Sequence, residues 1–203
     1  MVKPSNTDGS RSNSAKGRRR DAILQAAVTL LAEKGYVGAT TEEIAAAADV
    51  TKRTLYRHIG SKQRLLFEIH ENFIDAGLQR WQAVADRGLP PAEALEALIH
   101  EHVATVAAHR QAISVFFEEM KHLAPDDRAE IVRRRDSYEL ILFETMETGI
   151  RSGDFRDLDA RLAALIVLGT LTELYRWYRP EGPLTPDQVS DVLVKTIMRG
   201  LRH

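Results

Sequence analysis

The chain has 203 residues, of which 44% are hydrophobic and 28% are charged, a balance typical of a folded globular protein. No apolar run approaches the roughly 20 residues that a membrane span requires, and the polar N-terminus lacks the apolar region of a signal peptide. Cysteine is absent, which excludes disulfides, thiolate metal sites and cysteine nucleophiles. We therefore expect a cytoplasmic protein.

The predicted elements of the N-terminal part are short helices preceded by an arm. Residues 1–17 are rich in Ser, Asn, Gly and Lys and predict a disordered basic arm. Thr40 and Glu43 have the spacing of a capping box, which opens a helix. Apolar residues at helical spacing, with breaks between them, predict helices at residues 18–35, 40–48, 53–59 and 62–87.

The C-terminal part is also predicted to be helical. Gly88-Leu89-Pro90-Pro91 interrupts the pattern, and a second capping box precedes the last helix. The helices predicted after the interruption span residues 92–109, 111–123, 126–152, 158–179 and 186–201. No segment alternates with the period of a strand, so we predict an all-α chain of about nine helices.

Positive and negative charges are distributed unevenly along the chain. Residues 1–64 contain 12 Lys and Arg against 6 Asp and Glu, whereas residues 65–203 contain 16 against 23. The formal net charge of −1 therefore combines a basic N-terminal part with an acidic remainder. A local excess of positive charge is typical of a surface that meets a polyanion such as nucleic acid.

Residues 40–62 predict a helix-turn-helix, in which the first short helix braces across the DNA backbone and the second lies in the major groove. The candidate DNA-binding residues are Thr41, Thr51, Lys52, Arg53, Thr54, Tyr56, Arg57, His58 and Lys62. Arg53 and Arg57 are the candidates for reading bases, because a guanidinium can bind guanine O6 and N7 in bidentate fashion. We expect Thr41, Tyr56 and Lys62 to contact phosphates. The alternative interpretation is an ordinary solvated helix face.

This region resembles the tetracycline-repressor (TetR) family. The resemblance rests on Gly35-Tyr36, Thr40-Thr41, Ile44-Ala45, Val50-Thr51, Leu55-Tyr56, Lys62 and Leu65-Leu66. Ile59, at a packing position, stands where the family usually has an aromatic residue. The resemblance implies an all-α homodimer that binds a palindromic operator and holds a ligand in its C-terminal helices. We therefore divide the chain into the arm (1–17), a three-helix DNA-binding domain (18–64) and a larger ligand-binding and dimerisation domain (65–203).

The resemblance also implies a four-helix dimer interface made from the last two helices of each subunit, here residues 158–179 and 186–201. Both helices carry more apolar residues than one buried stripe requires. These residues are Leu162, Leu165, Ile166, Leu168 and Leu171 in the first helix, and Val189, Val192, Leu193, Ile197 and Leu201 in the second. Some of them are expected to belong to the core of the single chain instead.

The C-terminal run resembles a branch of the same family that controls the catabolism of fatty acids, sterols or aromatic acids and responds to acyl-CoA thioesters. The resemblance rests on Gly153-Asp154-Phe155, Leu158-Asp159, the segment from Tyr175 to Pro180, and Gly182. An acyl-CoA needs an apolar lining for its chain and cations for its phosphates. The candidate ligand-binding residues are Phe116, Phe117, Met120, Tyr138, Met146, Arg176, Trp177 and Arg179. Alternatively, the apolar residues are ordinary core and the arginines pair with nearby glutamates.

We therefore predict a bacterial repressor that a small molecule, an acyl-CoA thioester, releases from its operator. The alternative effector is a lipophilic drug, as in TetR-type regulators of efflux pumps. A helical adaptor without a DNA role is a further alternative, which a salt-dependent affinity for DNA would exclude. His102 and His109 share a helix face without a third metal ligand. Because no catalytic motif is found either, we expect no enzyme activity, no metal and no cofactor.

Overall fold

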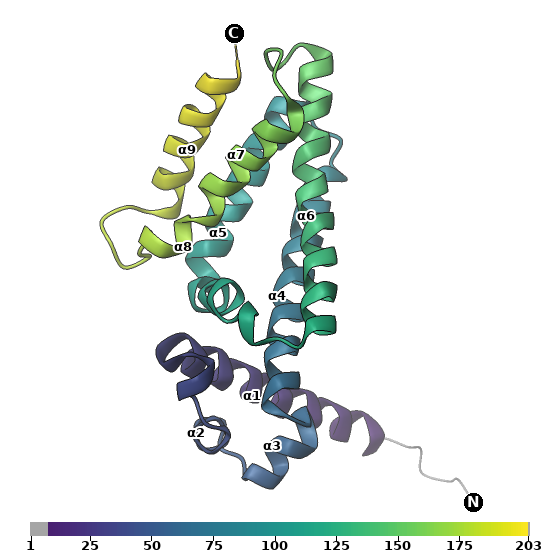
Figure 1. Ribbon diagram of the computed structural model, residues 1–203, viewed down its shortest axis with the longest axis vertical. Helices are drawn as coiled ribbons and strands as arrows, with labels where there is room; N and C mark the ends of the chain where they lie inside the picture. Colours follow the sequence, from purple (N-terminus) through teal and green to yellow (C-terminus); the bar gives the residue numbers. More distant parts are fainter. Residues whose placement is uncertain (1–7, 203) are drawn as a thin grey trace, which may run out of the picture.

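The computed structural model describes residues 8–202, in which α-helices and one short 3-10 helix account for the regular structure and no strand occurs (Figure 1). The all-α fold class is therefore confirmed. None of the helices in this part of the chain is long and apolar enough to cross a membrane. The helices are α1 (Asp8–Gly38), α2 (Thr41–Ala47), α3 (Lys52–Ile59), α4 (Lys62–Ala85), α5 (Pro91–Glu118), η1 (Met120–His122), α6 (Pro125–Ser152), α7 (Ala160–Thr172), α8 (Leu174–Trp177) and α9 (Pro186–Leu201).

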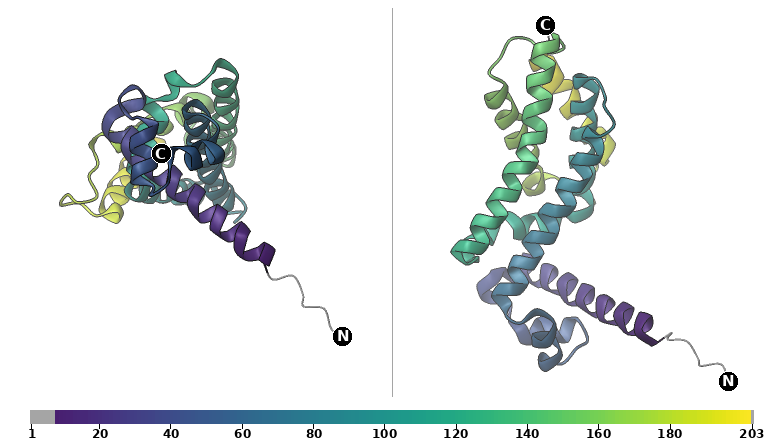
Figure 2. Two further views of the ribbon diagram at one scale, coloured as in Figure 1. Left: turned by 90° about the horizontal axis from the view of Figure 1, so that it is seen from below. Right: turned by 90° about the vertical axis from the view of Figure 1, so that its right-hand side faces the viewer.

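Helix α1 begins at Asp8, so part of the segment predicted to be disordered is helical, whereas residues 1–7 lie outside the described residues. Extending an existing helix requires no new nucleation, so a segment poor in apolar residues can continue a helix that is anchored further along. The anchors are Ile23, Ala27 and Leu31, each at most 2% exposed. Figure 2 shows the N-terminal end of α1 projecting away from the other helices.

Two predicted helix boundaries differ from the structure. The break predicted at His109 is a kink inside α5, with a φ of −131° and a ψ of 27° at His109. No proline or glycine interrupts the chain there, so the helix bends and continues as far as Glu118. Conversely, residues 158–179 form two helices rather than one, because α7 ends before Glu173 and α8 makes only one further turn.

Two hydrophobic cores share helix α4, which runs from the small group of helices α1–α3 into the larger group (Figure 1). Ile44 and Leu55 are fully buried in the N-terminal core, and Trp81 lies in the C-terminal core. The N-terminal core also includes Val115 and Phe116 from the end of α5. The domain boundary predicted after residue 64 therefore falls within α4, a helix that packs in both cores, and apolar contacts continue from one part of the molecule into the other.

Candidate functional site

Helices α2 and α3 form the predicted helix-turn-helix. The Thr40 hydroxyl accepts a hydrogen bond from the Glu43 N–H at 3.2 Å, and the Glu43 carboxylate accepts the Thr40 N–H at 2.9 Å. The chain turns at Asp49, whose φ is 52°. Directly after it, the Val50 N–H donates to the Ala45 carbonyl at 2.9 Å. The capping box and the turn thus fix where α3 begins relative to α2.

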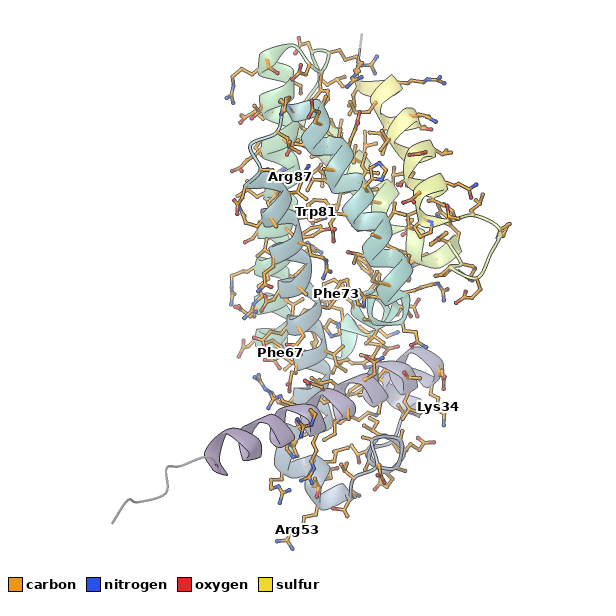
Figure 3. The ribbon with its side chains drawn as sticks, turned by 180° about the vertical axis from the view of Figure 1, so that it is seen from behind. Lys34, Arg53, Phe67, Phe73, Trp81 and Arg87 are labelled. Atoms are coloured by element: carbon orange, nitrogen blue, oxygen red, sulfur yellow. The ribbon has the colours of Figure 1, made fainter. Side chains whose placement is uncertain are left out.

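Helix α3 presents a basic face to the outside. The Thr51 hydroxyl caps the helix by accepting the Thr54 N–H at 3.1 Å, and Leu55 anchors the opposite face because it is fully buried. The exposed side chains of the helix are Lys52, Arg53, Tyr56 and Arg57, while Thr54 and His58 are half-buried beside them. Among residues 17–202, whose side chains the structure describes, none forms an ion pair with Arg53 or Arg57. Figure 3 shows Arg53 at the far end of the molecule from the C-terminal helices.

Two of the predicted phosphate-binding side chains are engaged inside the motif. Thr41 is 8% exposed, and its hydroxyl donates to the Glu42 carboxylate at 3.1 Å and lies 3.2 Å from the Tyr56 hydroxyl. Lys52, on the exposed face, forms an ion pair with Glu42. The hydrogen bond that the Lys52 ammonium donates to the Glu42 carboxylate lowers the pKa of the Glu42 carboxyl and raises the pKa of the Lys52 ammonium. Thr41 and Glu42 therefore hold Tyr56 and Lys52 in position on α3.

The end of α1 is held against the C-terminal part by Glu119, a 7% exposed residue that follows α5. The Glu119 carboxylate accepts the Tyr36 N–H at 3.1 Å. Gly35 makes room for it, because a Cβ there would lie 3.3 Å from Glu119 Oε1 and the φ of 69° also favours glycine. The His122 ring stacks on the Tyr36 ring at 4.9 Å and lies 3.5 Å from the Glu119 carboxylate. Lys62, predicted to bind phosphate, donates to the Tyr36 carbonyl and lies 4.4 Å from its ring centroid.

A cavity of about 280 Å³ lies among α4, α5, α6 and α7, and its walls are mostly apolar and aromatic, as is typical of small-molecule sites. Figure 3 shows Phe73 and Trp81, two of its lining residues, one above the other along α4. The lining residues are Phe73, Ile74, Gly77, Arg80 and Trp81 from α4; His102, Thr105, Ile113, Phe116 and Phe117 from α5; Arg135, Tyr138 and Glu139 from α6; and Leu165, Leu168, Gly169 and Thr172 from α7.

A chain of polar contacts crosses one wall of this cavity. The Tyr138 ring stacks on Trp81 at 3.9 Å, and its hydroxyl lies 3.0 Å from His102 Nδ1. His102 Nε2 lies 3.1 Å from the Leu171 carbonyl, which can only accept, so Nε2 carries the proton and Tyr138 donates to Nδ1. Burial lowers the pKa of His102 to about 4, so the imidazole is neutral at pH 7. The pair is therefore satisfied without a ligand.

The structure separates the predicted ligand-binding residues into two groups. Phe116, Phe117 and Tyr138 line the cavity. The others lie elsewhere: Met146 is fully buried in the C-terminal core, Met120 packs against the N-terminal core, and Arg176, Trp177 and Arg179 are exposed on α8 and the loop after it. The physical reason for the last three is the end of α7 at Thr172, because residues beyond it leave the face that α7 turns toward the cavity.

Sequence reasoning missed most of the cavity, including Arg80, Trp81 and His102. A signal was present on α4, where Phe73, Gly77 and Trp81 recur at the spacing of one helix face. This spacing indicates a face that turns inward. It does not indicate whether that face meets other side chains or an open space, since this depends on helices far away in the chain.

Helices α7 and α9 expose large apolar side chains. Leu162 and Ile166 on α7 are 57% and 63% exposed, and Val192 on α9 is 62% exposed. A groove of about 440 Å³ runs between the two helices and is lined by Leu162 and Ile166, among others. Leu168 and Leu171, predicted with them, are buried in the C-terminal core. A concentration of exposed apolar residues is typical of a protein–protein interface.

Both parts of the chain match known sequence families. Residues 23–69 match the family described as bacterial regulatory proteins, tetR family, and residues 88–201 match the one described as tetracyclin repressor-like, C-terminal domain. The HTH-type transcriptional repressor KstR2 of Rhodococcus jostii (strain RHA1) is 31% identical over 190 residues, which are 93% of this chain and 93% of that protein.

Solved structures share the fold over most of the chain. AibR, solved in complex with isovaleryl coenzyme A and operator DNA, is 32% identical and has a TM-score of 0.81, with 88% of this chain and 97% of that chain covered. The ketosteroid transcriptional regulator KstR2 of Mycobacterium tuberculosis is 28% identical and has a TM-score of 0.84, with 91% of this chain and 95% of that chain covered.

Proposed function

This chain belongs to the tetR family of bacterial regulatory proteins, and we propose that it is a repressor which leaves its operator DNA when an acyl-CoA thioester fills the cavity. It is a transcriptional regulator and not an enzyme. The observation that carries the proposal is the mostly apolar cavity of about 280 Å³, in a chain whose other end presents a basic recognition helix. Its place of action is then the bacterial cytoplasm, where the operator is.

The choice of effector is supported by the size of the cavity and by a solved relative. AibR is similar to this chain over most of its length, and its structure contains both isovaleryl coenzyme A and operator DNA. A cavity of about 280 Å³ holds an acyl group, whereas the far larger coenzyme A part must lie outside. A groove between α6 and α7 shares Arg135, Leu165 and Leu168 with the cavity and also carries the exposed Arg161. We place the coenzyme A part in this groove, and the drug-responsive alternative is not favoured.

The repressor acts as a homodimer in this proposal, and α7 and α9 supply its interface. The exposed Leu162, Ile166 and Val192 would then be buried against the same helices of the partner. A two-fold dimer presents two copies of α3 to one side of the duplex. Their separation should match one turn of DNA, about 34–36 Å, or a multiple of it, on a palindromic operator.

The path from the cavity to the DNA runs through the end of α5. Phe116 lines the cavity and belongs to the N-terminal core, and its carbonyl oxygen lies 3.1 Å from His70 Nε2 on α4. Glu119, three residues later, holds the Tyr36 N–H at the end of α1. A ligand that displaces Phe116 should therefore shift Glu119 and, with it, the end of α1. A shift of α1 would change the distance between the two copies of α3 in the dimer. The ligand acts only by its different affinity for the two conformations, typically about 1–3 kcal/mol.

The DNA contacts are proposed to come from the exposed face of α3, with Arg53 and Arg57 reading bases and the remaining predicted residues positioning the helix or binding phosphates. The test is fluorescence anisotropy of labelled duplexes from the DNA flanking this gene, at fixed ionic strength. Specific binding should weaken steeply as salt rises, and acyl-CoA thioesters should release the DNA whereas coenzyme A alone should not. Release by lipophilic drugs but not by any acyl-CoA would refute the proposed effector.

A further inference from the structure

We propose that the cavity takes only short and medium-length acyl groups, of up to about ten carbon atoms, and that Gly77 sets this limit. This inference rests on the proposed function, because it specifies which acyl-CoA thioesters the same cavity binds. Long-chain thioesters such as palmitoyl-CoA are then excluded as effectors.

The first observation is the volume of the cavity, about 280 Å³. A dry apolar cavity of about 150 Å³ in a protein core is large enough to bind benzene, which has six carbon atoms. On the same scale, the cavity of this protein holds about eleven non-hydrogen atoms. A decanoyl group consists of ten carbon atoms and one oxygen, so it is the longest straight acyl group that this space accommodates.

The second observation is an end wall, formed by Trp81, Tyr138 and His102, on the side of the cavity farther from the DNA-binding helices (Figure 3). The Tyr138 ring stacks on Trp81 of α4 at 3.9 Å, and its hydroxyl donates to His102 of α5 at 3.0 Å. His102 in turn donates to a backbone carbonyl of α7 at 3.1 Å. One turn further along α5 and α6, Ile99 and Leu142 are each at most 1% exposed. Because these contacts connect all four helices around the cavity, a longer acyl chain cannot displace the end wall without breaking several of them.

The third observation is that Gly77, in the interior of α4, leaves a space beside the end wall. Gly77 is buried and lines the cavity. A Cβ at this position would lie 3.5 Å from the Tyr138 ring, an ordinary contact distance, and outside its own helix no other group in the described part of the chain lies within 4 Å. Glycine inside a helix is less stable than alanine, and neither a positive φ nor a close helix contact requires it here. The consequence of this glycine is therefore the space that it leaves for a ligand.

The test of the length limit is isothermal titration calorimetry of the full-length protein with butyryl-, hexanoyl-, octanoyl-, decanoyl-, dodecanoyl- and palmitoyl-CoA, below the concentrations at which they form micelles. While the chain still fits, each added methylene should tighten binding about threefold to fourfold. Palmitoyl-CoA should bind at least about tenfold more weakly than the tightest binder of ten or fewer carbon atoms. Palmitoyl-CoA binding as tightly as that thioester would overturn the limit. If no thioester binds more tightly than coenzyme A alone, the acyl-CoA effector itself is refuted.

The variant Gly77→Leu tests whether this position sets the limit. The four carbon atoms of the leucine side chain would occupy space that the acyl chain otherwise fills, so the preferred acyl length should fall by about four carbon atoms. The tightest binder of the wild type should bind this variant at least about tenfold more weakly. The matched control is Ala83→Leu, which adds a leucine on the same helix at an exposed position outside the cavity and should keep the preference of the wild type.

A milder variant, Gly77→Ala, covers the case in which Gly77→Leu does not fold. Alanine should raise Tm, because it favours the helix, and its methyl group should weaken binding of the wild type's tightest thioester about threefold. Circular dichroism establishes that each variant is folded. The role of Gly77 is overturned if a folded Gly77→Leu protein binds that thioester as tightly as the wild type, or if Gly77→Ala does so where Gly77→Leu is unfolded.

Discussion

Replacing Glu119 should separate ligand binding from DNA release. Glu119 is 7% exposed at the end of α5, and its carboxylate accepts the Tyr36 N–H at 3.1 Å and lies 3.5 Å from His122 Nε2. Glu119→Ala removes the acceptor, whereas Glu119→Gln keeps an uncharged one. The neighbouring Glu118 is exposed and makes no contact with Tyr36, so Glu118→Ala is the matched control.

The size of the effect follows from one lost hydrogen bond to a charged acceptor, which leaves the Tyr36 N–H unpaired. Such a loss costs about 2 kcal/mol of the free energy of unfolding. For a chain of this length that corresponds to a decrease of about 4–8 °C in Tm. Coupling between two sites in regulators is typically about 1–3 kcal/mol, so one bond of this strength is large enough to carry most of it. Glu119→Gln should lie between Glu119→Ala and the wild type.

The assay measures the Kd for operator DNA by anisotropy, without and with a saturating acyl-CoA, and the Kd for the acyl-CoA by calorimetry. The coupling is measured by the DNA Kd with acyl-CoA divided by the DNA Kd without it. In Glu119→Ala this ratio should be about tenfold smaller than in the wild type. The affinity for acyl-CoA should stay within about threefold, because Glu119 does not line the cavity. Circular dichroism at the assay temperature establishes that the variant is folded. A folded Glu119→Ala protein with an unchanged ratio would refute the role of this contact in coupling.

Three further predictions concern the recognition helix, the buried histidine and the dimer. Arg57→Ala should weaken specific DNA binding by about 1–3 kcal/mol, measured by anisotropy at fixed salt, whereas Arg87→Ala, on an exposed arginine just after α4 (Figure 3), should not. Because burial lowers the pKa of His102 to about 4, the unfolded chain binds the proton first as pH falls. The free energy of unfolding measured in urea should therefore decrease from pH 6.5 towards pH 4, and less steeply in His102→Gln; equal slopes would contradict this. Ile166→Glu should halve the mass found by analytical ultracentrifugation, whereas Leu140→Glu, at a 50% exposed residue on α6, should leave it unchanged.

The helix-turn-helix could be predicted from the sequence because its determinants are local. The capping box of Thr40 and Glu43 and the cap at Thr51 act within a few residues of the backbone groups that they satisfy. The outward face of α3 follows from helical periodicity once Leu55 is recognised as its buried side. For the same reason the bounds of α6 and α9, which both begin at a proline, were predicted to within a residue or two.

The cavity among α4, α5, α6 and α7, which we propose as the effector site, could be predicted only in part, through Phe116, Phe117 and Tyr138. Met146 and Phe116 both lie on inward-facing sides of their helices, as their helical spacing predicts. Met146 nevertheless packs against other side chains, whereas Phe116 lines the cavity. Arg176, Trp177 and Arg179 were predicted to continue a single helix over residues 158–179; the structure ends α7 before Glu173 and leaves these side chains exposed, outside the cavity.

The amino-acid pattern by itself determined that this chain is all-helical, that its basic N-terminal part carries a helix-turn-helix, and which side of α3 faces outward. These properties depend on hydrogen bonds and periodicity within a few turns of one helix. Only the tertiary structure decided where the cavity lies, which side chains line it, and that Glu119 reaches Tyr36, 83 positions away in the chain. Such contacts depend on how separate helices pack against one another, and no local spacing of residues encodes that arrangement.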